Sequence, residues 1–297
     1  MANRQECFVL LRMGWRPPLA EFAATMQKRF PELGRIAGTD APPDSGMPGT
    51  LLVDGVSISM TIVNAPYPQE QLFAPVRLLN HIDPESLLAN QLAYVLLAVE
   101  GPDIDVSRIG KAAEAQADTA AAFAALLTLT ASAIAGEAPA IACFWADSWR
   151  LVQPEMMVEA GERVMEGDLP HDIWVSFAEV KGPRAGGGEN RAMMSFGLRK
   201  FCGREVEVAG APMSLAAMER VALQLCDRMR AGDGPIDYDG FDMGGGGRCV
   251  LRLAERFMRP RQPAVVAVPP DSAVDAETLE LKNAKRGGIA GRLFGKR

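Results

Sequence analysis

The sequence has few of the side chains that most enzyme and metal sites use. Its 297 residues include 2 histidines and 5 cysteines. The cysteines are scattered and form no Cys-x-x-Cys pair: Cys7, Cys143, Cys202, Cys226 and Cys249. This pattern argues against a disulfide framework or a zinc site of paired cysteines, and it favours reduced thiols. Because the first residues show no signal-peptide pattern, we expect a cytoplasmic protein.

Motifs that bind nucleotides or present a catalytic serine are missing as well. Ser195 lacks the first glycine of the Gly-x-Ser-x-Gly turn. The glycines of 291–297 are too close together for a phosphate-binding loop. Four aspartates cluster in 233–242, but the glutamate that closes a calcium loop is absent. We therefore predict neither a cofactor nor a metal.

What the chain does have is the composition of a folded protein. Hydrophobic residues make up 48% and charged residues 23% of it. The net charge of −6 is uneven, because 280–297 holds six basic side chains and one acidic side chain. The rest of the chain is acidic, which does not favour binding to nucleic acid.

Apolar periodicity predicts alternating strands and helices in the first half. The expected elements are strands at 8–12, 51–63 and 92–99 and helices at 19–30 and 66–79. Asp54-Gly55, inside 51–63, predicts a hairpin turn. The order is therefore β-α-β-β-α-β.

The longest predicted helix begins near Asp105 and ends at Ala135. Its last part, from Thr119 to Ala135, is 17 residues without a charge. This stretch is short and alanine-rich for a membrane span, and Asp118 and Glu137 flank it closely. A helix that is apolar all round in a soluble protein lies in a core, so we expect it to be buried.

The second half repeats the order of elements. Strands are expected at 141–145 and 249–253, and helices at 154–166 and at 215–230, with Ser214 as the N-cap. Residues 262–270 are expected to add an edge strand.

The densest strand signal lies between these elements. Ile173, Val175 and Phe177 have the period-two spacing of a strand. The alternation continues at 194–198 and 205–208, which predicts an antiparallel meander with its apolar side on a core.

A set of residues in this block also forms a family pattern. It consists of Leu169-Pro170, Ile173-Trp174-Val175, Gly197-Leu198, Phe201, Gly203 and Glu205-Val206-Glu207-Val208. The pattern resembles the bacterial domain-of-unknown-function family 4261, with weaker similarity over about residues 5–260. Such proteins often carry an Asp-Gly-Asp turn near Asp239, whereas this chain has Phe241 in place of the second acid. The resemblance implies a fold and a bacterial origin, and no reaction.

Together these patterns predict an α+β fold of two ferredoxin-like βαββαβ halves with largely antiparallel sheets. The first half is 5–136 and includes the long helix that joins the halves, and the second half is 137–270. Residues 271–297 are polar, then rich in glycine and basic side chains, and are predicted to form a disordered tail.

We hypothesise that the protein is not an enzyme and that it binds another protein. Trp145, Trp149 and Arg150 lie together at a predicted strand end and are residue types of interface hot spots. A simpler interpretation is one buried and one half-covered tryptophan. In the tail, Arg292, Leu293 and Phe294 are expected to dock on a protein or an anionic surface, or else to be solvated. Accessory, immunity or secretion-associated roles fit such a binder.

The alternative is an enzyme or small-ligand binder with a site in the cleft between the two halves. The residues expected to line that site are His171, Arg199, Glu205 and Asp239. His171 and Asp172 are the residue types of an acid–base pair, but neighbours on a strand point to opposite faces.

Overall fold

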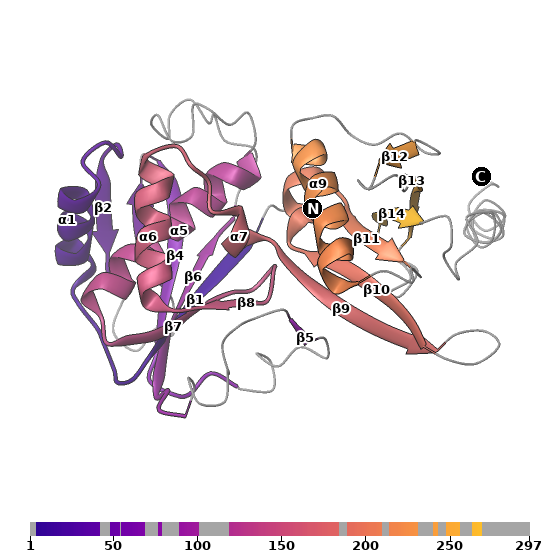
Figure 1. The fold of residues 1–297 in the computed structure, drawn as a ribbon. Helices are drawn as coiled ribbons and strands as arrows, with labels where there is room; N and C mark the ends of the chain where they lie inside the picture. The colour runs from indigo at the N-terminus through magenta and orange to yellow at the C-terminus, as the bar shows by residue number, and fades with distance from the viewer. Residues whose placement is uncertain are drawn as a thin grey trace, which may run out of the picture. The chain divides into compact units, whose positions relative to one another are not determined.

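The chain folds into two compact α+β units in the computed structural model (Figure 1). The described residues are 4–41, 48–53, 55–68, 77–78, 89–100, 119–183, 189–209, 214–230, 240–242, 248–255 and 263–268. The first unit comprises Met1–Pro75 and Asn80–Ser176, and the second comprises Val76–Leu79 and Phe177–Arg297. The boundary predicted from the sequence lies after residue 136, whereas the first unit continues to Ser176.

The first unit is built on an antiparallel sheet with the strand order β2-β3-β4-β6-β1-β7-β8. The strands are β1 (Gln5–Leu11), β2 (Ile36–Thr39), β3 (Gly49–Val53), β4 (Val56–Val63), β6 (Ala93–Val99), β7 (Ala140–Trp145) and β8 (Arg150–Val152). The hairpin predicted over 51–63 is confirmed, because Val53 pairs with Val56. Gly55 between them has a φ of 89°, a left-handed conformation that glycine adopts without strain.

Helices cover one face of this sheet. They are α1 (Leu19–Arg29), α5 (Thr119–Glu137), α6 (Pro154–Met165) and α7 (His171–Trp174). In Figure 1, α5 and α6 lie beside each other over the sheet, and α5 contacts β1, β6 and β7. The Gln5 side chain donates a hydrogen bond to Ala120 O of α5. Because side chains alternate along a strand, Cys7 faces the helices and Phe8 faces the opposite side.

The α5 helix is the core of the first unit. It is long and apolar enough to cross a membrane, but 94% of its most apolar window is buried within the fold. Two of its buried hydroxyls are satisfied within the helix, since Thr128 and Thr130 each donate to the carbonyl four residues earlier at 2.8 Å. The prediction of a buried helix at Thr119 to Ala135 is confirmed.

The contact between α5 and α6 depends on one glycine. A Cβ at Gly161 of α6 would lie 2.3 Å from Ser132 Oγ and 2.6 Å from Ser132 Cβ. Those distances are far below van der Waals contact, so the two helices approach this closely only with glycine at position 161.

The second unit has a mixed sheet with the strand order β12-β13-β14-β11-β10-β9-β5. The strands are β5 (Arg77–Leu78), β9 (Ser176–Pro183), β10 (Glu189–Phe196), β11 (Glu205–Ala209), β12 (Gly240–Asp242), β13 (Arg248–Glu255) and β14 (Pro263–Val268). The strand predicted at 262–270 is present as β14, but it is not at an edge. It pairs with β13 on one side and runs parallel to β11 on the other.

The second unit also contains α8 (Leu198–Cys202) and α9 (Leu215–Arg230). The predicted N-cap is confirmed, because the Ser214 hydroxyl accepts a hydrogen bond from the N–H of Ala217 at 3.3 Å. The α9 helix packs on β10 and β11 through the buried residues Met218, Val221, Ala222, Leu225 and Cys226.

The start of the central block differs from the prediction. Ile173 and Trp174 belong to α7 rather than to a strand, and β9 begins at Ser176. Both residues donate their N–H to the carbonyl of Pro170, which bends the chain into a helical turn. Trp174 is thereby buried, and its Nε1–H donates to Thr128 Oγ1 of α5 at 2.9 Å. The meander itself is present as β9, β10 and β11.

Candidate functional site

The turn between β7 and β8 has the most unusual backbone in the described part of the chain. Trp145 pairs with Arg150, so residues 146–149 form the turn. Trp149 has a φ of 53° and is the one non-glycine residue with positive φ among the described residues. A left-handed conformation costs a bulky L-residue roughly 1–2 kcal/mol. Glycine or asparagine is the usual residue at such a position.

Two buried serines hold this turn in place. The Ser148 hydroxyl donates to the carbonyl of Ile173 at 2.8 Å. The Ser176 hydroxyl donates in turn to the carbonyl of Ser148. Both serines are buried, so these hydrogen bonds are protected from water. The turn is therefore fixed by a segment 25 to 28 residues further along the chain.

The side chain of Trp149 packs on the face of the sheet opposite the helices. The cluster on this face contains Phe8, Tyr67 and Phe144, and the half-buried Tyr94, Leu96 and Trp149 pack against it. The Tyr67 ring meets Phe8 edge-on at 4.8 Å and Tyr94 edge-on at 5.3 Å. Burial, followed by the charges of Tyr94 and Glu6, raises the pKa of Tyr67, so its phenol stays neutral.

Trp145 is buried and Trp149 is half-buried, which is the simpler of the two interpretations of this tryptophan pair. Trp145 is 1% exposed and faces the helices, where its ring lies 6.2 Å from that of Trp174. It precedes the turn by one residue and points inward, because it continues the alternation of β7. Trp149 and Arg150 are both half-buried, so these two predicted residues do reach the surface.

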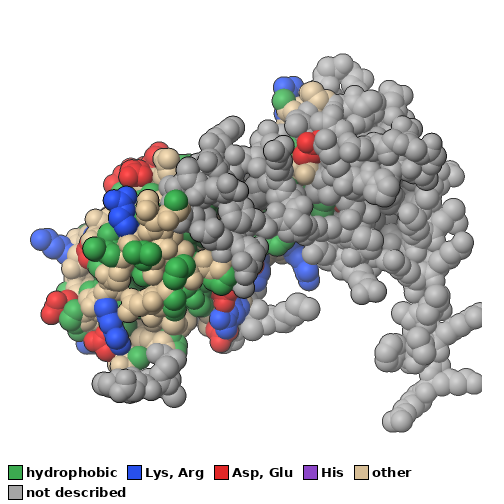
Figure 2. All heavy atoms as spheres, turned by 90° about the horizontal axis from the view of Figure 1, so that it is seen from below, with side chains coloured by type: hydrophobic (Ala, Val, Ile, Leu, Met, Phe, Trp, Pro, Cys, Tyr) green, Lys and Arg blue, Asp and Glu red, His purple; other side chains and the backbone are tan. Residues whose placement is uncertain are grey.

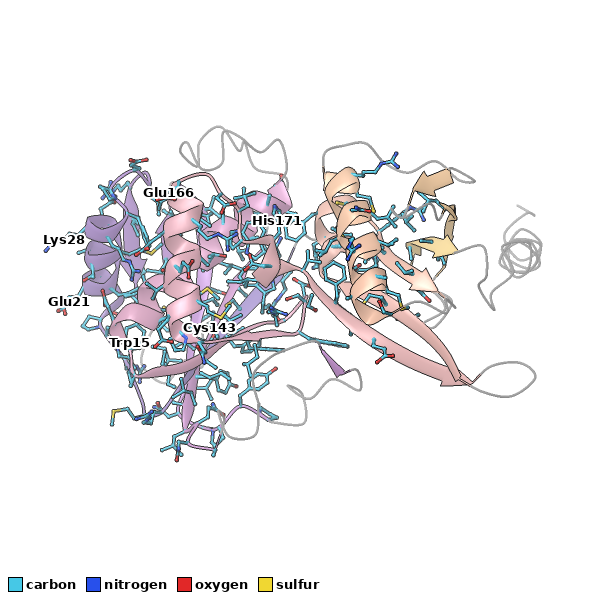
Figure 3. The ribbon with its side chains drawn as sticks, viewed as in Figure 1. Trp15, Glu21, Lys28, Cys143, Glu166 and His171 are labelled. Atoms are coloured by element: carbon cyan, nitrogen blue, oxygen red, sulfur yellow. The ribbon has the colours of Figure 1, made fainter. Side chains whose placement is uncertain are left out.

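The residues of the predicted cleft lie in different parts of the fold. His171 belongs to α7 in the first unit (Figure 3). Its ring meets that of Trp174 edge-on at 5.2 Å. Arg199 is exposed on α8 of the second unit, and Glu205 is buried on β11. Asp239 and the tail residues Arg292, Leu293 and Phe294 lie outside the described residues.

The carboxylate of Glu205 stabilises the local fold through hydrogen bonds from both of its oxygens. Its Oε2 accepts a hydrogen bond from Ser195 Oγ at 2.6 Å, and its Oε1 accepts one from the N–H of Gly197 at 3.1 Å. Ser195 Oγ accepts a further hydrogen bond from the N–H of Val206. Together these contacts close the connection from β10 through α8 to β11, where Gly197 has a φ of 92°.

Sequence reasoning missed a second surface, at the other end of β1. Met13 is 58% exposed and Leu92 is 60% exposed, the two highest values among the large hydrophobic side chains of the described residues. We name this surface the Met13 rim and define it as Arg12, Met13, Trp15, Arg16 and Leu92. The run Arg-Met-Gly-Trp-Arg-Pro-Pro directly after a buried strand was the signal that could have identified it.

Comparison of the chain with protein-family models, with curated proteins and with solved structures finds no match. The resemblance of the central block to family 4261 therefore stays a prediction.

Proposed function

We propose that this chain is a bacterial cytoplasmic protein that acts by binding another protein, and that the Trp149 turn is a contact surface. The observation that carries the proposal is the left-handed backbone of Trp149, held with its side chain half-buried. Strain that the surrounding structure maintains at a surface residue is a reason to infer a function for that residue. Tryptophan is also the residue type most enriched among the energetic centres of protein interfaces.

The hydrogen bonds that hold the Trp149 turn also favour its role as a contact surface. Binding is costly when loops and side chains must first be ordered. The hydrogen bonds of Ser148 and Ser176 have already ordered this turn. Tyr94 and Leu96 are half-buried and pack against the same cluster as Trp149, and Arg150 adds a charged group able to form directional hydrogen bonds. A rigid aromatic side chain beside an arginine is suited to a protein partner.

The test is affinity purification of the full chain from its native host, followed by quantitative mass spectrometry. Trp149→Gly removes the indole and relaxes the backbone, so the variant is expected to fold. Leu223→Ser is the matched control, because Leu223 is 46% exposed on α9 of the second unit. We expect the recovered amount of a specific partner to decrease at least tenfold with Trp149→Gly and to be unchanged with Leu223→Ser. Equal recovery with both variants would overturn the proposal.

We also propose that the first unit has a ferredoxin-like core. The strand order β4-β6-β1-β7 supports this arrangement, with α1 after β1 and α5 after β6. β1 and β4 run in the same direction, because each is antiparallel to β6. These are the relations of a βαββαβ motif. The second helix of the motif would be α5 and its fourth strand β7. The sequence pattern instead gave these places to the helix predicted at 66–79 and the strand predicted at 92–99. An experimental structure with another strand order would refute this proposal.

A further inference from the structure

The Met13 rim brings exposed apolar side chains to one end of two neighbouring strands. Leu11 ends β1 and pairs with Ala93, the first residue of β6. Met13 follows Leu11 by two residues, and Leu92 directly precedes Ala93. The N–H of Leu92 donates to the carbonyl of Leu11 at 2.9 Å, which fixes the two chain segments side by side. The two most exposed large hydrophobic side chains of the described residues thus share one end of the sheet.

Neighbouring contacts hold the segment of Met13 in a defined conformation. The N–H of Arg12 donates to the carbonyl of Pro139 at 3.0 Å. Trp15 is half-buried, and its ring meets that of Phe22 on α1 edge-on at 5.6 Å. A Cβ at Gly14 would lie 3.0 Å from Asn64 Oδ1, so the segment runs close to the end of β4. The side chain of Met13 is therefore exposed, while the backbone on either side of it is held by contacts of Arg12, Gly14 and Trp15.

The charge of the rim is positive. Arg12 and Arg16 are exposed and bracket Met13 and Trp15 in the sequence. In the described part of the chain, neither arginine forms an ion pair. Figure 2 shows one face of the first unit, on which hydrophobic side chains lie between separate basic and acidic side chains. Methionine, tryptophan and arginine are the residue types enriched at protein interfaces.

We propose that the Met13 rim binds a protein segment whose apolar side chains are flanked by carboxylates. Met13 and Leu92 bury against the apolar side chains, and Arg12 and Arg16 pair with the carboxylates. Charge complementarity selects this partner, because arginine forms bidentate hydrogen bonds with carboxylates. A lipid surface is disfavoured, since each basic residue adds only about 1 kcal/mol of attraction to an anionic membrane and the rim has two.

This surface is independent of the Trp149 turn. The turn follows Trp145, which pairs with Cys7, and the N–H of Ala146 donates to the carbonyl of Glu6. It therefore lies at the start of β1, whereas the rim lies beyond its end at Leu11. A variant of one surface leaves the other intact, so failure of one proposal is distinguishable from failure of the other.

The experiment selects peptides from a displayed library of random 16-residue sequences on the full chain. Counter-selection uses the double variant Met13→Ser/Leu92→Ser and retains the peptides that depend on the rim. Leu52→Ser is the matched control, because Leu52 is 44% exposed on β3 of the same sheet. We expect rim-dependent peptides rich in Asp and Glu next to apolar residues. Their affinity falls at least tenfold with the double variant and is unchanged with Leu52→Ser or Trp149→Gly.

A charge exchange then tests the role of the arginines. The double variant Arg12→Glu/Arg16→Glu is expected to bind the selected peptide at least tenfold more weakly. It is expected to bind better when the acidic residues of the peptide are replaced by lysine. The proposal is overturned if no rim-dependent peptide is recovered, if such peptides carry no excess of acid, or if the charge exchange has no effect. It is also overturned if vesicles of phosphatidylglycerol bind the rim and the peptides do not.

Discussion

The two ends of the first sheet present aromatic and apolar side chains in different ways. At the start of β1, buried hydroxyls hold the Trp149 turn, and the side chain packs on an aromatic cluster. Beyond the end of β1, Met13 and Leu92 are exposed, and backbone hydrogen bonds position their segments. We therefore expect substitutions at the first end to change both folding and the proposed binding, and those at the second to change the proposed binding alone.

The largest expected effect comes from the core on the helix side of the sheet, at the strand residue that precedes the Trp149 turn. Trp145→Ala removes a side chain that is 1% exposed and packs against Trp174. Loss of a buried tryptophan typically costs about 3–5 kcal/mol. We expect a decrease of that size in the free energy of unfolding, measured by urea denaturation. A decrease below about 1 kcal/mol would mean that Trp145 is not a core residue.

A smaller effect is expected when one support of the turn is removed. Ser148→Ala deletes the donor to Ile173 O and leaves a buried carbonyl without that hydrogen bond. A buried polar group that loses its partner costs about 1–3 kcal/mol. Urea denaturation should show a loss in this range. Ser57→Ala provides the matched control, since Ser57 is exposed on β4 and should give no measurable change.

The strain at Trp149 predicts that the glycine variant is more stable than the alanine variant, which is the reverse of the usual order. Alanine normally stabilises a chain by about 0.5–1 kcal/mol relative to glycine. At φ 53°, glycine is relaxed and alanine is strained. We therefore expect Trp149→Gly to be more stable than Trp149→Ala by about 1 kcal/mol in the same denaturation assay. If alanine is the more stable of the two, the left-handed conformation is incorrect.

The smallest effect on folding is expected at the Met13 rim. The double variant Met13→Ser/Leu92→Ser changes two exposed side chains and removes no described hydrogen bond. Substitutions at such surface sites usually change stability by less than about 0.5 kcal/mol. A melting temperature equal to that of the parent chain, together with lost peptide binding, would support the comparison. A strongly destabilised double variant would contradict it.

Local signals in the sequence predicted the local features of the fold. Gly55 marked the hairpin and Ser214 the helix cap, because a turn and a cap depend on a few neighbouring residues. The uninterrupted apolar run from Thr119 predicted burial of α5 correctly. A helix that is buried on all sides can pack within either unit. Its apolar sequence therefore did not predict the boundary between the two units, which lies at Ser176.

Features that depend on distant contacts were not predictable. Ile173 has strand spacing, yet the hydrogen bond from Trp174 to Thr128 stabilises a helical turn there. The sequence identified Trp145 and Trp149 as a pair, but it did not distinguish the buried ring from the strained, half-buried one. That distinction depends on Ser148 and Ser176, whose partners lie far along the chain. Likewise, β5 pairs with β9 across about a hundred residues of sequence.

The most direct test of the central proposal is photo-crosslinking from position 149 in living cells. A benzophenone amino acid would replace Trp149 in one strain and Leu223, on the second unit, in another. The proposal predicts a specific crosslinked protein from position 149 and none of the same mass from position 223. Absence of a crosslink from position 149, or the same product from both positions, would contradict the assignment of the Trp149 turn as a binding surface.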